Sequence, residues 1–272
     1  MVVFPNCKIN IGLNIVRKRE DGYHDLETVF YPVPVHDVLE VVQHHEDAFV
    51  QTGLSIDGDS SNNLCVKALQ LVRSIHPDLP LVKMHLHKTI PMGAGLGGGS
   101  SDGAHTLLLL NKKFGLGFSQ SQLIEMALQL GSDCPFFIVN QPCFAWSRGE
   151  MMEPLSLPLT GYQLVLINPG IHVNTGWAFK QITPQQPAFS LQEMAMLSVK
   201  EWKPVVKNDF EKAVGMAHPT VAEIVHYAYT NQAVYAAMSG SGSTCFALFE
   251  GHQTLPDFSP FSHCWIRKIK LS

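Results

Sequence analysis

Glycine gathers in one short stretch of this 272-residue chain, residues 91–101, which reads PMGAGLGGGSS. Without a Cβ atom, glycine backbone can approach an anion closely and adopt positive φ, so that successive N–H groups converge. Alternating apolar residues predict a strand over 81–87, and a helix is predicted from about residue 100 to 114, whose N-terminus adds free N–H groups and a positive dipole. The pattern predicts a phosphate-binding loop, whereas the alternative, a tight turn, needs only one or two glycines.

Two other phosphate-binding patterns fit this stretch less well. Gly93, Gly95 and Gly98 match the spacing G-x-G-x-x-G of dinucleotide-binding proteins, but no βαβ unit precedes them. The nearest acid about twenty residues beyond the loop, Glu125, falls inside a predicted helix rather than at a strand end. The Walker pattern fails because no lysine precedes Ser100. An oxidoreductase that binds a nicotinamide or flavin cofactor remains the alternative from a different class.

A lysine lies within an otherwise apolar N-terminal strand. Ile9, Ile11 and Leu13 would share one face of that strand, so Lys8, Asn10, Gly12 and Asn14 would share the other. Polar side chains in such a place are costly to bury unless they bind something. Lys8 and Asn10 are therefore candidate site residues, and a solvated sheet edge is the alternative.

An isolated acid, Asp133, follows a helix that is predicted to begin at Ser119 and to end at Gly131. The apolar residues 135–137 after it are predicted to form a strand, because Pro135 opposes a simple continuation of the helix. A partly desolvated carboxylate in such a setting suits a general base. An N-cap or turn aspartate is the alternative, and spacing alone favours it.

Two further segments carry candidate binding residues. Asp21-Gly22 predicts a hairpin turn, and the rings of Tyr23 and His24 beside it would suit stacking on a nucleobase; a plain hairpin is the alternative. The run 239–244 reads SGSGST and is a second loop rich in hydrogen-bond donors. It would line a phosphate site or a lid, and the alternative, a linker, fits poorly just before an apolar strand.

The elements that must position these residues alternate along the chain. Further helices are predicted over 64–75, with Asn62 or Asn63 as N-cap, and over 208–217 and 219–230. Further strands are predicted over 38–42, 164–167, 245–249 and 264–270, and residues 150–160, rich in Pro, Leu and Ser, are predicted to form a hinge.

Composition excludes several classes of protein. Hydrophobic residues make up 46% and charged residues 15%, which is typical of a globular protein with a sizeable core. The net charge of −4 and the lack of a long basic run speak against nucleic-acid or membrane binding, and we expect neither a signal peptide nor a membrane span. Six scattered cysteines indicate reduced thiols. His85 and His87 share a strand face, but without a visible third ligand we predict no metal site.

The motifs together resemble those of the GHMP kinases, the superfamily of galactokinase, homoserine, mevalonate and phosphomevalonate kinases. Within it, the chain is similar to the family that phosphorylates a cytidine-diphosphate-linked methylerythritol in non-mevalonate isoprenoid synthesis. The resemblance runs in order over most of the chain, through the glycine stretch and the segments KIN (8–10), REDGYH (19–24), GSDCPFF (131–137), NDFE (208–211) and MSGSGS (238–243).

The resemblance implies an α+β fold of two domains, 1–155 with the ATP loop and 156–272 on the substrate side, the last strand packing back on the first domain, with the active site in the cleft between them. It implies transfer of the γ-phosphate of ATP, with Mg²⁺ as counter-ion, to the 2-hydroxyl of the methylerythritol group. It also implies a cytoplasmic enzyme, a monomer or weak homodimer, that binds neither nucleic acid nor membrane.

Site residues follow from the same resemblance. Asp133 falls on the catalytic base and Lys8 on the active-site lysine. The substrate, which carries a cytidine diphosphate group, is expected to contact Asn10, Tyr23, His24, Phe179, Gly240, Ser241 and Gly242. ATP is expected to contact Asn63, Leu64, Lys88, Pro91, Met92, Gly93, Ala94, Gly95, Leu96, Gly97, Gly98, Gly99, Ser100 and Ser101.

Two departures and two alternatives accompany the resemblance. Cys7 and Gly103 replace residues usual in the family, and Asp102 places an acid beside the phosphate loop, either turned away from it or helping to hold magnesium. A kinase of this superfamily with a mevalonate-like or homoserine-like substrate is the alternative within the class, but it would have no use for Tyr23 and His24. A nucleotide-binding regulator without turnover would not need both Lys8 and Asp133.

Overall fold

The computed structural model describes residues 1–55 and 60–271, and these form two compact units. The first consists of Met1–Lys8, Pro32–Met92 and Gly97–Gln141, and the second of Ile9–Tyr31, Gly93–Leu96 and Pro142–Ser272. The segments alternate along the chain, so the compact units do not coincide with the continuous stretches 1–155 and 156–272. The glycine-rich stretch itself contributes residues to both units.

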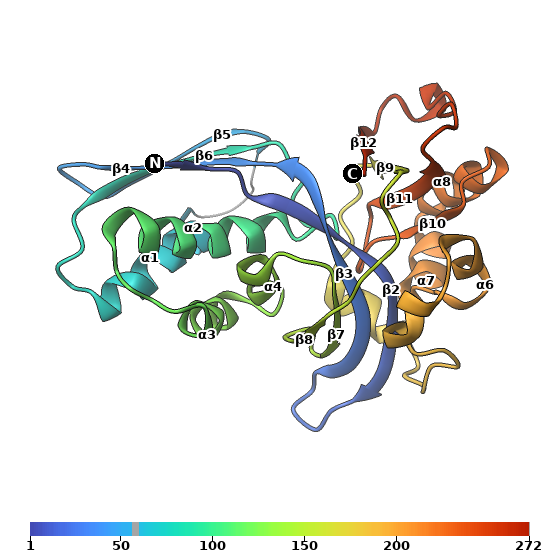
Figure 1. Cartoon of the computed structure of the whole chain (residues 1–272), viewed down its shortest axis with the longest axis horizontal. Coiled ribbons are helices and arrows are strands. Elements are labelled where there is room, and N and C mark those ends of the chain that lie inside the picture. Colours follow the sequence, from blue (N-terminus) through green and yellow to red (C-terminus); the bar gives the residue numbers. More distant parts are fainter. Residues whose placement is uncertain (56–59, 272) are drawn as a thin grey trace. The chain divides into compact units, whose positions relative to one another are not determined.

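The first unit is a four-stranded sheet with helices on one face (Figure 1). The strand order is β1-β4-β6-β5, with β4 antiparallel and β5 parallel to β6. The strands are β1 (Val2–Val3), β4 (Val38–Gln43), β5 (Ala48–Gly53) and β6 (Val82–Lys88), and the helices are η1 (Ser60–Asn62), α1 (Leu64–Ile75), α2 (Gly98–Phe114), α3 (Gln120–Leu130) and α4 (Cys134–Val139).

Local signals in the sequence explain most of these boundaries. Asn63 caps α1 by accepting a hydrogen bond from the N–H of Cys65 at 2.9 Å, and Ser119 and Gln122 form the predicted capping box of α3. Gly115 ends α2 with a φ of 59°, a conformation that favours glycine. The helix prediction for this segment is confirmed, although α2 begins at Gly98, two residues earlier than expected.

The prediction of a strand after Asp133 is wrong. Residues Cys134–Val139 form a short helix, α4, in which Pro135 lies in the first turn. Proline is tolerated there because the first N–H groups of a helix have no partner within the helix. The aromatic rings of Phe136 and Phe137 are buried, so this helix anchors the segment that carries Asp133 in the core of the first unit.

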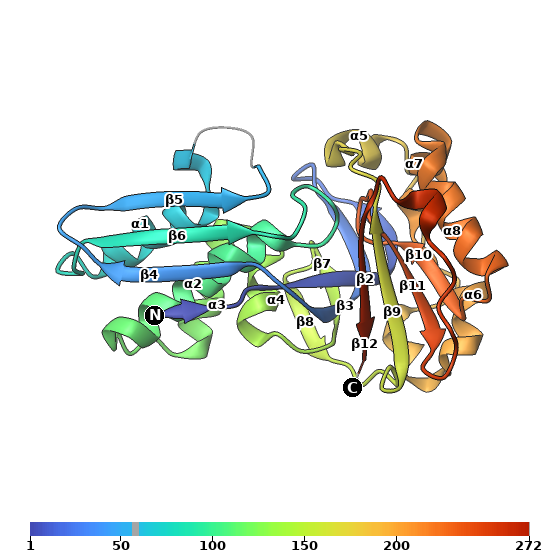
Figure 2. The ribbon, with the colours of Figure 1, turned by 90° about the horizontal axis from the view of Figure 1, so that it is seen from above.

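The second unit contains the remaining helices, one complete sheet and most of another (Figure 2); the first residues of β2, up to Lys8, and the last residues of β3, from Pro32, belong to the first unit. One sheet has the strand order β10-β11-β9-β12, and the helix α8 contacts β10 and β11. The other has the order β2-β3-β7-β8. The elements are β2 (Asn6–Lys18), β3 (His24–His36), β7 (Cys143–Ser147), β8 (Met151–Pro154), β9 (Tyr162–Asn168), α5 (Thr175–Lys180), η2 (Leu191–Met196), η3 (Val199–Glu201), α6 (Trp202–Val205), α7 (Asp209–Ala217), α8 (Pro219–Thr230), β10 (Tyr235–Met238), β11 (Cys245–Glu250), η4 (Ser259–Phe261) and β12 (Trp265–Lys270).

The hinge predicted for residues 150–160 is partly wrong, because Met151–Pro154 form strand β8, paired antiparallel with β7. The predicted strands over 164–167, 245–249 and 264–270 are confirmed as β9, β11 and β12. One βαβ connection is present, contrary to the expectation that none precedes the glycine-rich stretch, because α1 lies between the parallel strands β5 and β6. The pairs β1–β4, β4–β6, β7–β8 and β9–β11 are antiparallel, and this mixture of helices with largely antiparallel sheets confirms the α+β class.

All six cysteines are free, and five of them are buried. Burial raises the pKa of the Cys7 thiol to about 12 and that of Cys134 also to about 12, so these thiols stay protonated and inert near neutral pH. Within residues 1–55 and 60–271, every helix is too short or too polar to cross a membrane.

Candidate active site

The two candidate catalytic residues meet in the first unit. Lys8 lies in β2, and its Nζ is 3.2 Å from Oδ2 of Asp133, which precedes α4. The lysine side chain is 4% exposed and the aspartate side chain 36% exposed. The solvated-edge alternative for Lys8 is excluded by its burial. Asp133 does occupy a turn at the N-cap position of α4, as the alternative expected, but its side chain makes no capping hydrogen bond and pairs with Lys8 instead. The pair offers an approachable carboxylate oriented by a buried ammonium group.

Glycine at position 97 is required by the neighbours of this pair. A Cβ atom on Gly97 would lie 2.9 Å from Cζ of Phe137 and 3.1 Å from Cε of Lys8. Gly97 also has a φ of 68° and immediately precedes α2. The N-terminus of α2 therefore begins directly beside the Lys8 side chain, where the first N–H groups of a helix can bind an anion.

The two serines of the loop have different surroundings. Ser100 is partly exposed, and its hydroxyl bonds with the Cys134 thiol. Ser101 is fully buried, its N–H donates to the carbonyl of Gly97 at 2.9 Å, and its hydroxyl lies 3.2 Å from Nδ1 of His105 in the next turn. Of the two serines, only Ser100 has surface to offer to a ligand.

Lys88, which was expected near ATP, lies at the end of β6 with a completely buried side chain. Its Nζ donates to Oδ2 of Asp102 at 2.7 Å and also to Oδ2 of Asp37. Burial opposes the charge on Lys88, but the two carboxylates outweigh it and raise its pKa. Burial raises the pKa of Asp102 to about 7, against the opposing effect of Lys88. Asp102 is thus turned to Lys88, and this settles the question that the sequence left open.

The expected adenine-pocket residues Asn63 and Leu64 lie at the start of α1, both partly exposed. The oxygen of the Asn63 side chain serves as the helix cap described above. Gly103 explains how α1 and α2 come close together, since a Cβ atom there would lie 2.9 Å from Cβ of Leu64. The departure at Gly103 therefore has a packing reason, and contact of Asn63 and Leu64 with adenine stays a prediction.

In the second unit, the segment Gly93–Leu96 lies against the serine-glycine loop 239–244. Oγ of Ser239 donates to the carbonyl of Gly95 at 2.8 Å, and the N–H of Thr244 donates to the carbonyl of Ala94 at 3.2 Å. Gly95, with a φ of 77°, has no room for a side chain, because a Cβ atom would lie 2.1 Å from the carbonyl oxygen of Ser239. The structure thus brings together two glycine-rich segments that are about 145 residues apart in the sequence.

Asn10 contacts this loop. Its N–H donates to Oγ of Ser239 at 3.0 Å, and its Nδ2 donates to Oγ1 of Thr28 at 2.9 Å. A Cβ atom on Gly240 would lie 3.1 Å from Oδ1 of Asn10. The predicted substrate residues Asn10 and Gly240 are therefore neighbours, and Ser241 extends from the same loop toward Thr175, with 3.1 Å between their hydroxyl oxygens.

The segment 208–211 supplies positioning residues to which the sequence analysis gave no role. Nδ2 of Asn208 donates to the carbonyls of Met238, at 2.7 Å, and Gly240, at 2.9 Å. Oε2 of Glu211 accepts from the N–H of Met238 at 2.7 Å, and burial raises the pKa of this carboxyl. The motif NDFE at 208–211 was the available signal. Asn208 caps α7 by accepting from the N–H of Phe210 at 3.0 Å, and it holds the loop as well.

The predicted nucleobase residues all belong to the second unit. The rings of His24 and Phe179 are stacked, with centroids 4.7 Å apart and planes inclined by 15°. Tyr23 is 56% exposed, and the guanidinium carbon of Arg148 lies 5.0 Å from its ring centroid. Burial lowers the pKa of His24, with a smaller contribution from Lys18, and so favours the neutral imidazole. The hairpin therefore carries aromatic surface, with Arg148 as a neighbour that the sequence gave no means to identify.

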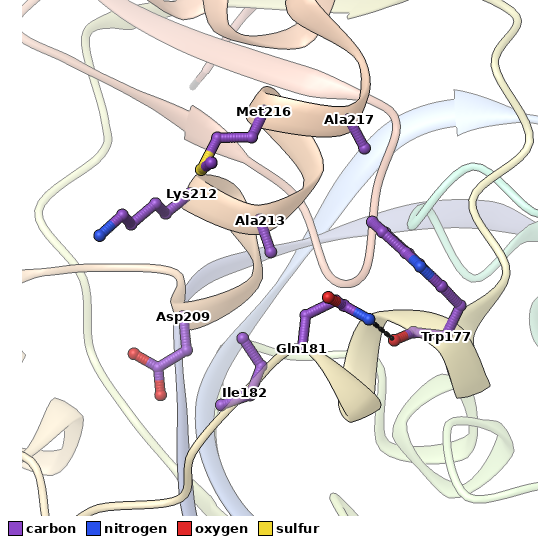
Figure 3. A pocket seen from close by; sticks show the side chains of 8 residues that line it. All are labelled: Trp177, Gln181, Ile182, Asp209, Lys212, Ala213, Met216 and Ala217. Atoms are coloured by element: carbon purple, nitrogen blue, oxygen red, sulfur yellow. Dashed lines mark hydrogen bonds between the residues drawn. The ribbon is translucent and has the colours of Figure 1, made fainter.

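A pocket of about 530 Å³ opens between α5 and α7 (Figure 3). Its lining includes Trp177 of α5 and Gln181 just after that helix, and Asp209 and Lys212 of α7. None of the predicted site residues lines it, although α5 also carries Phe179.

Among the described residues, His44, His45 and Glu46 form the group of possible metal ligands, with ligand atoms within 4.8 Å of one another. They lie in the polar connection after β4, largely exposed, where such groups are common without a metal ion. His85 and His87 instead share a hydrogen-bond partner, Oγ1 of Thr52, at 2.8 and 2.9 Å.

Comparison with known proteins identifies two family regions in the chain. Residues 63–141 match the GHMP kinases N terminal domain, and residues 190–257 match the GHMP kinases C terminal domain. The Methanococcus jannaschii mevalonate kinase shares the fold, with a TM-score of 0.71 at 10% sequence identity over 100% of this chain and 98% of that one.

Proteins of higher sequence identity match nearly all of the chain. Proteins of Parabacteroides distasonis and Bacteroides fragilis, both named 4-diphosphocytidyl-2-C-methyl-D-erythritol kinase, are 46% and 49% identical to it; they match 100% and 99% of this chain and 100% of their own lengths. A crystal structure of 4-(cytidine 5'-diphospho)-2C-methyl-D-erythritol kinase superposes with a TM-score of 0.80 at 31% identity, covering 92% of this chain and 91% of that one.

Proposed function

The chain belongs to the GHMP kinase family, and we propose that it transfers the γ-phosphate of ATP to the 2-hydroxyl of 4-diphosphocytidyl-2-C-methyl-D-erythritol, a step of non-mevalonate isoprenoid synthesis. It is an ATP-dependent phosphotransferase that acts on a hydroxyl group of a small molecule. The observation that supports this substrate is the sequence identity to two proteins named as this kinase, which is 46% and 49% over essentially the whole chain.

Asp133 takes the proton of the attacking hydroxyl in this proposal. A tertiary alcohol is a weak acid, so its oxygen becomes a better nucleophile as a carboxylate within hydrogen-bond reach removes the proton. The 36% exposure of the Asp133 side chain leaves surface at which a hydroxyl can approach. Lys8, 3.2 Å away, orients the carboxylate and offsets negative charge on the transferring phosphoryl group.

The N-terminus of α2 and the glycines before it bind the phosphates of ATP in the same proposal. N–H groups of Gly98, Gly99 and Ser100 lie in the first turn of α2, where a helix has no internal acceptors for them. Mg²⁺ would enter as the counter-ion of ATP, held mainly by phosphate oxygens. Asp102 does not fit as its ligand, because that carboxylate is buried and bonded to Lys88.

The aromatic cluster of the hairpin recognises the cytosine ring. His24 and Phe179 already stack on each other, and Tyr23, the residue before His24, offers a largely exposed ring next to Arg148. Stacking between flat rings suits a nucleobase and gives nothing to a mevalonate or homoserine molecule. This cluster therefore separates the proposed substrate from those of other kinases in the family.

The test is release of ADP from magnesium-ATP by the purified protein with 4-diphosphocytidyl-2-C-methyl-D-erythritol, mevalonate and homoserine in parallel. We expect turnover with the first substrate alone, and a phosphate ester on its tertiary hydroxyl by ³¹P NMR. The Asp133→Asn variant serves as the control for contaminating kinases. Turnover only with mevalonate or homoserine would retain the kinase and discard the substrate.

We further propose that the enzyme works in the cytoplasm as a monomer or weak homodimer and binds neither nucleic acid nor membrane. Six free cysteines fit a reducing compartment, and a net charge of −4 does not favour binding to polyanions. Light scattering coupled to gel filtration over a range of protein concentrations tests the oligomeric state. A stable higher oligomer would contradict it.

A further inference from the structure

Three ionisable side chains are buried together beside the start of α2. Nζ of Lys88 donates to Oδ2 of Asp102 and to Oδ2 of Asp37, and the exposed fractions of the three side chains are 0%, 3% and 0%. The mechanism proposed above uses none of them. We refer to Asp37, Lys88 and Asp102 as the buried charge cluster.

The cluster connects the chain on both sides of the phosphate loop. Oδ1 of Asp37 accepts from the N–H of Thr89 at 2.6 Å and of Ile90 at 3.0 Å, so it holds the two residues just before the loop. Asp102 lies in the second turn of α2, the helix that follows the loop. Because both carboxylates bond to Lys88, the entrance of the loop and the helix after it are fixed to one ammonium group.

The start of α2 lies directly against this ammonium group. A Cβ atom on Gly98, the first residue of the helix, would lie 3.3 Å from Nζ of Lys88 and 3.0 Å from Cγ2 of Ile90. The backbone whose N–H groups are proposed to bind phosphate therefore rests on the buried charge cluster. A shift of Lys88 or of Ile90 would move that backbone.

Stability alone does not explain such a cluster. Taking charges out of water costs free energy that ion pairing only partly returns, and apolar residues of similar volume often serve stability equally well or better. One ammonium group here faces two carboxylates, and Oδ1 of Asp102 has no hydrogen-bond partner among the described residues. Hydrogen bonds are directional, however. They therefore fix the backbone around Asp37, Lys88 and Asp102 in one arrangement more strictly than apolar contacts would.

We propose that Asp37, Lys88 and Asp102 are positioning residues of the ATP site, which set the affinity for ATP by holding the N-terminus of α2 and residues 89–90 in place without touching ATP. The inference rests on the proposed function in one respect, since it takes residues 91–101 as the phosphate-binding loop.

The test compares steady-state kinetics of the wild type with Asp102→Ala and Asp102→Asn. Alanine removes the bond to Lys88, so we expect the KM for ATP to rise about 10-fold or more, corresponding to loss of one charge-assisted hydrogen bond. We expect kcat at saturating ATP to change less than about 3-fold, with the KM of the alcohol unchanged. Asparagine retains an oxygen that can accept from Lys88, so its KM for ATP stays within about 3-fold of the wild type.

The matched control is Leu110→Ala, a buried change near the other end of α2. It should lower the melting temperature and leave the KM for ATP unchanged. An unchanged KM in Asp102→Ala, or an equal rise in Leu110→Ala, would overturn the proposal, since ATP affinity would then be independent of the cluster or would follow stability alone. Asp102→Ser, whose hydroxyl can bond to a water molecule, replaces the alanine variant if that protein does not fold.

Turnover by the wild-type protein distinguishes failure of the proposed function from failure of this inference. Absence of any ATP turnover by the wild type would contradict the proposed function. Normal turnover together with an unchanged KM for ATP in the Asp102 variants would contradict only the positioning role.

Discussion

Two lysine–aspartate groups lie in the first unit, and they differ in what they leave open. Lys8 meets one carboxylate, Asp133, at 3.2 Å, and that side chain is 36% exposed. Lys88 meets two carboxylates, and all three side chains are essentially inaccessible. The Lys8–Asp133 pair leaves a carboxylate oxygen accessible to a substrate, whereas the charged groups around Lys88 contact only one another and the rest of the protein. Residue type does not distinguish a reacting pair from a positioning cluster, whereas accessibility does.

The largest difference between the Lys8–Asp133 pair and the buried charge cluster is expected in their effect on stability. Lys88→Met leaves two carboxylates buried without their cation, so we expect the free energy of unfolding to fall by about 3–5 kcal/mol. Lys8→Met leaves Asp133 in contact with water, and we expect a loss of at most about 1 kcal/mol. Denaturant unfolding followed by circular dichroism measures both. Equal losses would remove the distinction between the two groups.

For the catalytic rate, we expect the Lys8–Asp133 pair to matter more than the buried charge cluster. Asp133→Asn removes the proton acceptor, so we expect kcat to fall about 10²-fold or more, with an unfolding curve close to that of the wild type. Asp78→Asn makes the same chemical change at an exposed position after α1 and should leave kcat unchanged. ADP release under saturating substrates is the measurement. A kcat for Asp133→Asn within a few-fold of the wild type would assign the base to another residue.

The pH dependence of stability should report on the buried charge cluster. Burial raises the pKa of Asp102 from its ordinary value of 3.8 to about 7. Between those values the folded protein holds a proton that the unfolded chain has released, so this group lowers stability as pH rises from about 4 to 7, and the loss is complete above pH 7. The slope for one proton is at most about 1.4 kcal/mol per pH unit.

Asp102→Asn is the variant that isolates this effect, because its amide does not titrate. Denaturant unfolding at several pH values between 4 and 8 should show a flatter pH dependence for the variant than for the wild type. Parallel curves would show that Asp102 titrates near its ordinary value in the folded protein.

The smallest effects are expected at two neighbouring glycines. A Cβ atom on Gly97 would press on Phe137 and on Lys8 in a backbone conformation with φ of 68°, so Gly97→Ala should cost about 1–2 kcal/mol and lower kcat. Gly98→Ala gains about 1 kcal/mol in helix propensity, which offsets its tight contacts with Ile90 and Lys88. We therefore expect Gly98→Ala to change stability little and to raise the KM for ATP. A kcat loss of equal size in both variants would contradict the separation of the two groups.

Local rules predicted most elements of the fold, because their signals lie within a few residues. The caps at Asn63 and Ser119 and the stop at Gly115 are examples, and each is confirmed. The failure at residues 134–139 has an equally local cause. Proline opposes the interior of a helix but not its first turn, so Pro135 can begin a helix as readily as it can end one.

For the site, the sequence determined which residue types are available and where they lie along the chain. The glycine stretch, Lys8 in an apolar strand and the isolated Asp133 were visible as candidates, and the resemblance to GHMP kinases gave them expected roles. The segment 208–211 was also visible as a motif. That it holds the loop at Met238 and Gly240 was not visible, because those hydrogen bonds join residues about 30 positions apart.

Only the tertiary structure decided which charged residues remain accessible. Asp102 and Asp133 are both single acids near a predicted helix, and nothing local separates them. Asp37, in the connection between β3 and β4, also accepts a hydrogen bond from Lys88, and Asp102 is buried with them. Burial is a property of all the elements that pack around a side chain, so a linear pattern can propose an acid but cannot say whether water, a substrate or only the protein reaches it.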